Sequence, residues 1–172
     1  MTQHSADHWI KHLKLQPHPE GGAYTRIYTS DLIIPRSSLP ESFSGDRNSC
    51  THIYYLLQQN DFSAFHRIRS DELWHFYDGD TLCIYEINKQ GELTEHLLGK
   101  DLENNESPFC VIRSGSWFAS VLKTKTSYAL VGCTVSPGFD FAEFEMGDRT
   151  KLIELYPQHK ELIISLTRQS NS

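Results

Sequence analysis

The chain has 172 residues, the length of one domain of ordinary size, and a formal net charge of −6. Its lysines and arginines form no basic run, so we do not expect binding to the phosphate backbone of a nucleic acid. No apolar segment approaches the ~20 residues of a membrane-spanning helix, and the N-terminus lacks a signal-peptide pattern. We therefore expect a soluble, cytoplasmic protein without a nucleic-acid or membrane partner.

Apolar residues at helical spacing predict a short N-terminal helix over about 5–15, with Ser5 as its N-cap. Residues from about 23 to 144 then form many short segments that are rich in β-branched and aromatic residues and are separated by turn residues. Because no helical segment separates them, they indicate an antiparallel barrel or sandwich. Between the first two strands, the polar segment 34–49 predicts a long surface loop that could act as a lid.

The C-terminal part is predicted to be helical over about 148–167. Asp148 is a candidate N-cap, and Pro157 should break the segment into two short helices. There is no internal repeat and no interdomain linker. We predict a single, mainly β domain over 1–172 with short helices at both ends.

The segment "FHRIRSDELWHFYDGD" (65–80) contains the residues best suited to chemistry. If the short connection 69–71 makes a hairpin, the alternation of side chains along strands places His66 and Glu72 on one interior face. His75 is then expected to face away, unless a β-bulge shifts the register. The two histidines and the glutamate therefore do not automatically form one set of metal ligands.

The spacing of this segment resembles the first motif of the cupins, which reads Gly, five residues, His-x-His, three or four residues, Glu, six residues, Gly. His66 takes the first histidine position, Ile68 the second, Glu72 the glutamate position and Gly79 the closing glycine position, whereas Asn60 replaces the leading glycine. The resemblance implies a cupin double-stranded β-helix, that is, a jelly-roll barrel.

The second cupin motif, Pro-x-Gly-x-x-His, has its best match in "RSGSWF" (113–118), where Arg113 replaces the proline and Phe118 the histidine. The usual cupin metal site has three histidines and a glutamate, so only His66 and Glu72 remain of it here. We therefore expect no tightly bound metal. A site that uses His66, Glu72 and an inward-turned His75 is the alternative.

Four segments together resemble one small cupin-type family of uncharacterised function. They are "HPEGGAYTRIY" (18–28), the segment 65–80, "GSWF" (115–118) and "VSPGFDFAEFE" (135–145). Its members are similar in fold to the nucleotide-sugar epimerase cupins. This resemblance implies a homodimer in which one sheet's aromatic outer face is buried and the N-terminal strand crosses to the partner.

The predicted catalytic pair is His66 as general base and Glu72 as its orienting or charge-stabilising partner. In the epimerase cupins a tyrosine acts as the acid, and Tyr24, Tyr54, Tyr77 and Tyr128 are candidates for that position. The residues predicted to contact a small-molecule ligand are Glu20, Tyr24, Arg26, Tyr54, His75, Trp117 and Phe118.

Three functions remain open at this point. The first is a metal-free isomerase or epimerase that acts on a small sugar-like or carbonyl compound. The second is a cupin that binds a small ligand without turning it over, and the third is a metal-dependent cupin enzyme. A nucleotide-binding P-loop is excluded in practice, because no glycine-rich loop lies between a strand and a helix.

Overall fold

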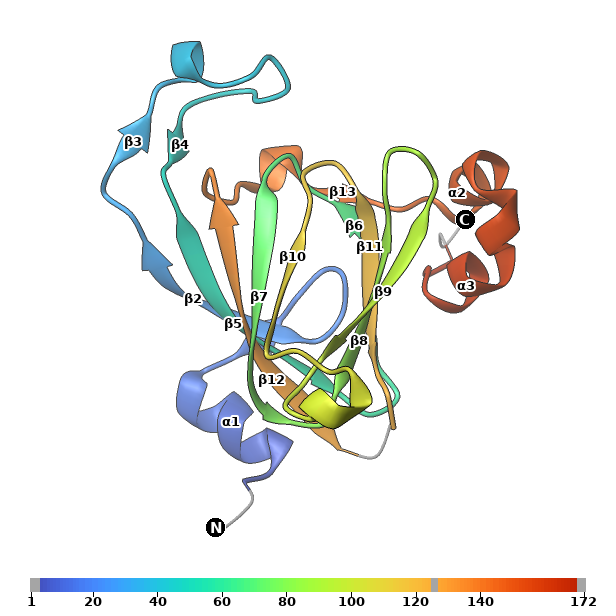
Figure 1. Cartoon of the computed structure of the whole chain (residues 1–172). Helices are drawn as coiled ribbons and strands as arrows, with labels where there is room; N and C mark the ends of the chain where they lie inside the picture. Colours follow the sequence, from blue (N-terminus) through green and yellow to red (C-terminus); the bar gives the residue numbers. More distant parts are fainter. Residues whose placement is uncertain (1–3, 125–126, 170–172) are drawn as a thin grey trace.

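Two antiparallel sheets face each other in the computed structural model, which describes residues 4–124 and 127–169 (Figure 1). The strand order is β1-β2-β5-β12-β7-β10 in the 6-stranded sheet and β13-β6-β11-β8-β9 in the 5-stranded sheet. The strands of the first sheet are β1 (Gln16–Pro17), β2 (Ala23–Thr29), β5 (Thr51–Gln58), β12 (Tyr128–Ser136), β7 (Asp71–Gly79) and β10 (Phe109–Ile112). Those of the second are β13 (Glu145–Met146), β6 (Phe62–Arg67), β11 (Trp117–Leu122), β8 (Leu82–Ile87) and β9 (Leu93–Leu98). This arrangement confirms the predicted jelly-roll fold.

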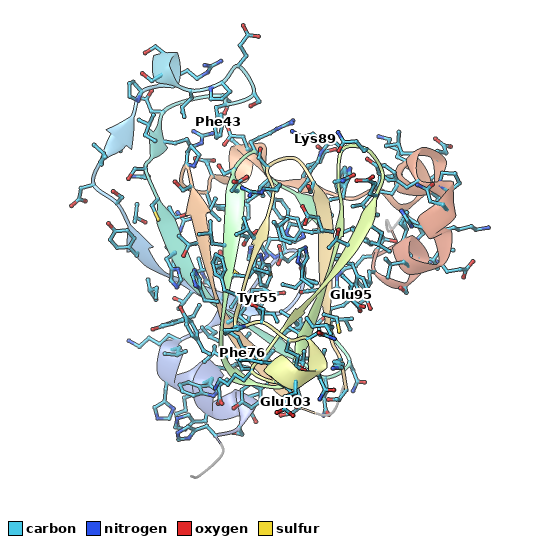
Figure 2. All side chains as sticks on the ribbon, viewed as in Figure 1. Phe43, Tyr55, Phe76, Lys89, Glu95 and Glu103 are labelled. Carbon is cyan, nitrogen blue, oxygen red and sulfur yellow. The ribbon has the colours of Figure 1, made fainter. Side chains whose placement is uncertain are left out.

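The main hydrophobic core fills the space between the two sheets (Figure 2). Trp74 and Tyr55 enter it from the first sheet, and Ile84, Leu122 and Phe118 enter it from the second. Burying one large apolar side chain contributes roughly 1.5–3 kcal/mol, so this core is the main source of stability.

Short helices cover the outer faces of the barrel (Figure 1). Helix α1 (Ala6–Leu13) packs on the 6-stranded sheet, where Leu15, Leu56 and Leu130 are buried. Helices α2 (Arg149–Leu155) and α3 (Lys160–Ser165) pack on the 5-stranded sheet. The short 3-10 helices are η1 (Arg36–Ser38), η2 (Leu102–Asn104), η3 (Phe141–Glu143) and η4 (Pro157–His159).

The predicted caps of these helices are confirmed. The Ser5 side chain accepts a hydrogen bond from the backbone N–H of His8, and Asp148 accepts one from Lys151. Pro157 begins η4, which separates α2 from α3 as predicted. Within the described residues, no helix has the length and apolar character that crossing a membrane requires, and the four cysteines are free thiols.

Two local predictions need correction. The segment 34–49 is not only a loop, because β3 (Ile33–Ile34) pairs with β4 (Arg47–Asn48) and forms a hairpin that projects from the barrel (Figure 1). The expected hairpin between the strands of His66 and Glu72 is wrong. Strand β6 pairs with β11 and β13, whereas β7 pairs with β12 and β10, so the connection 68–70 crosses from one sheet to the other.

Candidate functional site

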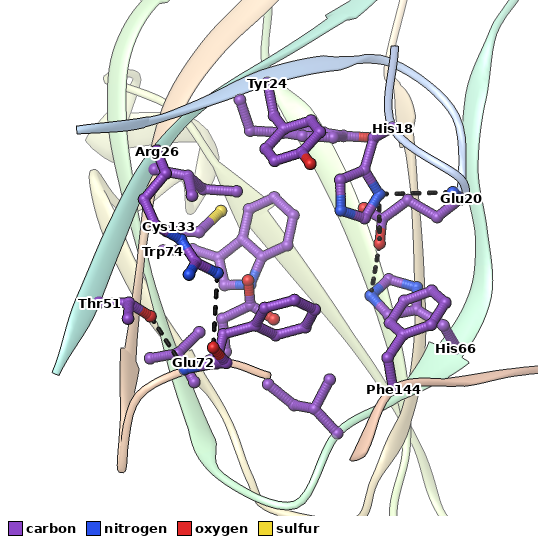
Figure 3. A pocket seen from close by; sticks show the side chains of 15 residues that line it. His18, Glu20, Tyr24, Arg26, Thr51, His66, Glu72, Trp74, Cys133 and Phe144 are labelled. Atoms are coloured by element: carbon purple, nitrogen blue, oxygen red, sulfur yellow. Dashed lines mark hydrogen bonds and ion pairs between the residues drawn. The ribbon is translucent and has the colours of Figure 1, made fainter. Parts of the chain in front are cut away.

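A cavity lies between the inner faces of the two sheets (Figure 3). The enclosed volume is about 30 Å³, room for about one water molecule, and it reaches about 490 Å³ only when the gaps between atoms and the open mouth are counted. It is narrow, and both sheets and the loop before β2 contribute to its wall. The lining residues are His18, Glu20, Tyr24, Arg26, Thr51, Ile53, Tyr55, His66, Ile68, Glu72, Trp74, Cys133, Val135, Phe139 and Phe144.

The "HPEGG" segment places Glu20 inside the barrel. Gly21 and Gly22 both have positive φ angles, of 119° and 69°. A Cβ atom on Gly21 would lie 2.1 Å from the carbonyl oxygen of Phe62, so only glycine allows the loop to approach β6 this closely. The Glu20 carbonyl accepts a hydrogen bond of 2.8 Å from the Ala64 N–H. The loop is thereby fixed on β6, and the Glu20 side chain is 7% exposed.

Glu20 and His66 are in direct polar contact inside the cavity. Their Oε2 and Nε2 atoms are 3.0 Å apart, and both side chains are buried (Figure 3). The other ring nitrogen of His66, Nδ1, lies 2.7 Å from the Ala64 carbonyl oxygen. A carbonyl only accepts hydrogen bonds, so Nδ1 carries a proton. Ser63 donates a hydrogen bond of 2.9 Å to Oε1 of Glu20.

Burial determines how this pair is protonated. It lowers the pKa of His66 to about 4, against the opposing hydrogen bond to Ala64. Burial also raises the pKa of Glu20, although His18, Ser63 and Tyr55 act in the opposite direction. Both groups therefore favour their neutral forms. A protonated Glu20 that donates a hydrogen bond to Nε2 of a neutral His66 agrees with the raised pKa of Glu20, the lowered pKa of His66 and the 3.0 Å contact. In this arrangement the two side chains share one proton.

Glu72 is a second buried carboxyl group in the same cavity. Burial, followed by Glu20 when that group is ionised, raises its pKa to about 8, whereas a hydrogen bond with Cys133 lowers it. At neutral pH Glu72 is thus a neutral carboxylic acid, which can donate a hydrogen bond. The predicted convergence of His66 and Glu72 on one interior is confirmed, because both line the cavity. The partner of His66 is Glu20, however, and not Glu72.

Further polar groups surround the pair. The His18 ring is near Glu20, with 3.3 Å between Nδ1 and Oε2, and burial lowers its pKa. Tyr24 packs edge-on against His18, with 4.5 Å between ring centroids. The Tyr55 hydroxyl donates a hydrogen bond of 2.9 Å to the Gly21 carbonyl. Of the tyrosines predicted as acid candidates, only Tyr24 lines the cavity.

Four residues predicted at the site lie elsewhere. His75 and Tyr54 are on the outer face of the 6-stranded sheet, where His75 is 3.2 Å from the Thr134 hydroxyl. The register of β7 shifts between the partners Leu130 and Val131, which lies beyond His75 and does not turn it inward. Trp117 packs in the core under the C-terminal helices. Phe118 belongs to the main core, where its ring centroid lies 4.1 Å from that of His66.

Several lining residues were not predicted from the sequence. His18 and Tyr55 are the most informative, because both lie next to Glu20. His18 was detectable, since it is the first residue of the quoted "HPEGG" segment. No local sequence pattern marks Tyr55 as a lining residue, because the face to which its side chain points depends on the register of β5 against β2 and β12.

The donor atoms do not fit a cupin metal. Ile68 and Phe118 occupy two of the four usual ligand positions and are buried and apolar. Both nitrogens of His66 already have partners, Ala64 and Glu20. The alternative set with His75 is ruled out, because His75 lies on the opposite face of β7. Within the described ranges, no three His, Cys, Asp or Glu side chains are arranged to hold a metal ion.

The two facing antiparallel sheets with His66 and Glu72 on their inner faces define the chain as a cupin. More particularly, residues 7–147 match the family described as Cupin superfamily (DUF985), and the chain belongs to this family. It is similar to a protein of Shewanella oneidensis of known structure, with 39% identity and a TM-score of 0.88, over 98% of this chain and 100% of the other.

Two further proteins of known structure are similar to the chain, one in sequence and fold and the other in fold alone. A hypothetical protein from Leishmania major has 32% identity and a TM-score of 0.88, over 96% of this chain and 100% of the other. Oxalate decarboxylase from Bacillus subtilis has 13% identity and a TM-score of 0.53, over 90% of this chain and 37% of the other, which supports the fold alone. No curated protein matches the chain.

Proposed function

We propose that the protein is a metal-free enzyme of isomerase or epimerase type that moves a proton on a small carbonyl compound. The observation that carries this proposal is the buried 3.0 Å contact between Glu20 and His66 in a cavity that also contains Glu72. Proton transfer next to a carbonyl needs a base for the carbon-bound proton and an acid for the oxygen. The cavity contains groups for both tasks.

In the proposed reaction, the proton on the substrate carbon passes to the Glu20–His66 pair, which then holds two protons. The electron pair of the broken C–H bond moves to the carbonyl oxygen, and that oxygen takes the proton of Glu72. Return of the proton from the pair to the neighbouring carbon on the same face, with the enol O–H proton going back to Glu72, completes an isomerisation; an epimerisation needs a proton donor on the opposite face of the carbon. No metal takes part in any step.

The raised pKa of Glu72, to about 8, supports its assignment as the acid, because the carboxyl group retains its proton at neutral pH. Compared with the sequence-based hypothesis, His66 remains the basic residue, but its partner is Glu20. Tyr24 is the remaining tyrosine that could assist as an acid from the cavity wall.

The test uses solvent deuterium. The protein is incubated in heavy water with small aldehydes, ketones, oxo acids and hydroxy acids, and deuterium at carbon is followed by NMR. We expect exchange with the wild type and a loss on the order of 10²–10⁴-fold with His66→Ala, since a positioned base contributes this much. His75→Ala is the matched control, because it removes a histidine from the outer face of the neighbouring strand. Equal exchange by the wild type and His66→Ala would refute the proposal.

A non-catalytic role in ligand binding is the alternative. It is favoured by the fact that both ring nitrogens of His66 already have partners, so no lone pair is free for a substrate in this arrangement. A compound that binds by calorimetry but shows no exchange would decide for this second function.

A further inference from the structure

We propose that the ligand of the cavity is a small monocarboxylate and that Arg26 binds its carboxylate group at the cavity mouth. The inference deepens the proposed function for the chemical step, but the binding mode itself does not depend on turnover. It rests on the partners of Arg26, on its position and on the charge inside the cavity.

Arg26 combines two features: it forms no ion pair with a carboxylate, as is also true of Arg36, Arg69 and Arg149 among the described arginines, and it alone of these four lines the cavity. Four arginines form ion pairs with carboxylates, namely Arg47 with Glu143, Arg67 with Glu145, Arg113 with Asp71 and Arg168 with Asp61. Within the described residues, no carboxylate forms such a pair with Arg26. Its guanidinium makes one long hydrogen bond, of 3.4 Å, to the Phe139 carbonyl and lies 5.8 Å from the centre of that ring. An exposed cation without an ion-pair partner therefore lies at the mouth of the cavity.

Arg26 lies between the cavity and the outer surface of the protein. A surface groove outside the cavity is lined by Gln16, Tyr24, Arg26, Phe139, Asp140 and Phe141. Tyr24, Arg26 and Phe139 line the inner cavity as well, so they form the boundary between the two spaces. Asp140 is acidic, but its carboxylate is engaged as the cap of η3 and accepts a hydrogen bond of 2.8 Å from the Ala142 N–H. Arg26 is thus the cation of this groove, which it shares with the Asp140 carboxylate.

The charge of the cavity supports an anionic ligand of low charge. Among the lysines and arginines that the structure describes, Arg26 alone lines the cavity. Burial raises the pKa of both carboxyl groups inside, Glu20 and Glu72, and this weakens their repulsion of an anion. One unopposed positive charge matches one negative charge. A planar guanidinium also matches the two oxygens of a carboxylate, whereas a phosphate dianion would need further cations.

The geometry then sets the orientation of the ligand. Figure 3 shows Arg26 on one side of the cavity and the Glu20–His66 pair on the other, with all three side chains directed inward. A carboxylate on Arg26 leaves the remainder of the molecule between Trp74 and Phe144, which are apolar walls. The narrow space favours a short, flat acid whose carbonyl or hydroxyl carbon reaches the pair. Short 2-oxo and 2-hydroxy acids have this shape.

The test compares acids with neutral compounds of the same shape. Binding of pyruvate, lactate, pyruvamide, lactamide and inorganic phosphate is measured by ligand-observed NMR and calorimetry. We expect at least one acid to bind at least about 10-fold more tightly than its amide and more tightly than phosphate, since a charge-assisted hydrogen bond is worth more than a neutral one. Arg26→Gln should abolish this preference, and Arg26→Lys should restore part of it. Arg69→Gln, which removes an exposed arginine outside the cavity, should leave it unchanged.

Four results would overturn the inference. The first is equal binding of acids and amides, and the second is a preference that survives in Arg26→Gln with an unchanged melting temperature. The third is no binding of any acid, and the fourth is tighter binding of phosphate. The outcome is separable from that of the proposed function. Arg26-dependent binding without deuterium exchange refutes only the enzyme, and exchange that is independent of Arg26 refutes only the anion site.

Discussion

Replacing Glu72 by glutamine should stabilise the protein in a pH-dependent way. The pKa of Glu72 is raised from 4.5 to about 8, mainly by burial. Below pH 4.5 the carboxyl group is protonated in both the folded and the unfolded chain, and the shift has no effect. As the pH rises towards 8, the unfolded chain loses the proton and the folded protein retains it, so stability falls. Each pKa unit corresponds to about 1.4 kcal/mol, which gives a cost of about 3 kcal/mol at pH 7.

Glutamine has nearly the shape of the protonated acid and does not titrate, so the variant should lack this cost. Urea unfolding of both proteins at pH 4.5 and pH 7 measures the difference. We expect similar stabilities at pH 4.5 and a gain of about 3 kcal/mol for Glu72→Gln at pH 7. Glu154→Gln, at an exposed position of α2, is the control and should show no such trend. A variant that is equally or less stable than the wild type at pH 7 would refute the buried, protonated state of Glu72.

Two further predictions concern the frame of the site. Arg47→Ala leaves Glu143 buried without its partner and should cost about 3 kcal/mol in chemical unfolding, since both side chains are only 6% exposed; a loss below about 1 kcal/mol would contradict the importance of this pair. Gly79→Ala should cost about 2 kcal/mol or more, because φ is +97° and a Cβ would lie 2.0 Å from the Tyr128 carbonyl oxygen. Gly45→Ala has its nearest atom at 3.5 Å and should change the stability by less than about 0.5 kcal/mol; similar losses for both alanines would show that the strain is absent.

The fold and part of the site follow from local patterns. Strand alternation with the cupin spacing places His66 and Glu72 towards one interior, and both line the cavity. The hairpin behind that argument does not exist, because β6 and β7 lie in different sheets. His66 and Glu72 nevertheless line one cavity, because the inner faces of the two opposed sheets border the same space. A short polar connection such as "RSD" (69–71) does not distinguish a hairpin from a crossing between sheets.

The remainder of the site depends on contacts between distant segments. Glu20 precedes His66 by 46 positions, and only the fold of the glycine loop onto β6 brings them together. The neighbours Trp117 and Phe118 show the same limit, because aromatic character alone does not tell which of the two faces the barrel. Here Phe118 faces the core beside His66, and Trp117 faces the helices. The homodimer implied by the family resemblance stays a prediction.

The most direct measurement of the central claim is the protonation state of His66, which NMR of protein with ¹⁵N-labelled histidine can follow from pH 5 to pH 8. The proton shared with Glu20 and the Nδ1 contact with Ala64 predict a neutral ring with its proton on Nδ1 throughout this range, as a pKa of about 4 requires. Addition of a carboxylate that binds should shift the Nε2 resonance in the wild type but not in Arg26→Gln. A His66 ring that titrates near pH 6.5, or whose proton lies on Nε2, would contradict the buried pair and the mechanism built on it.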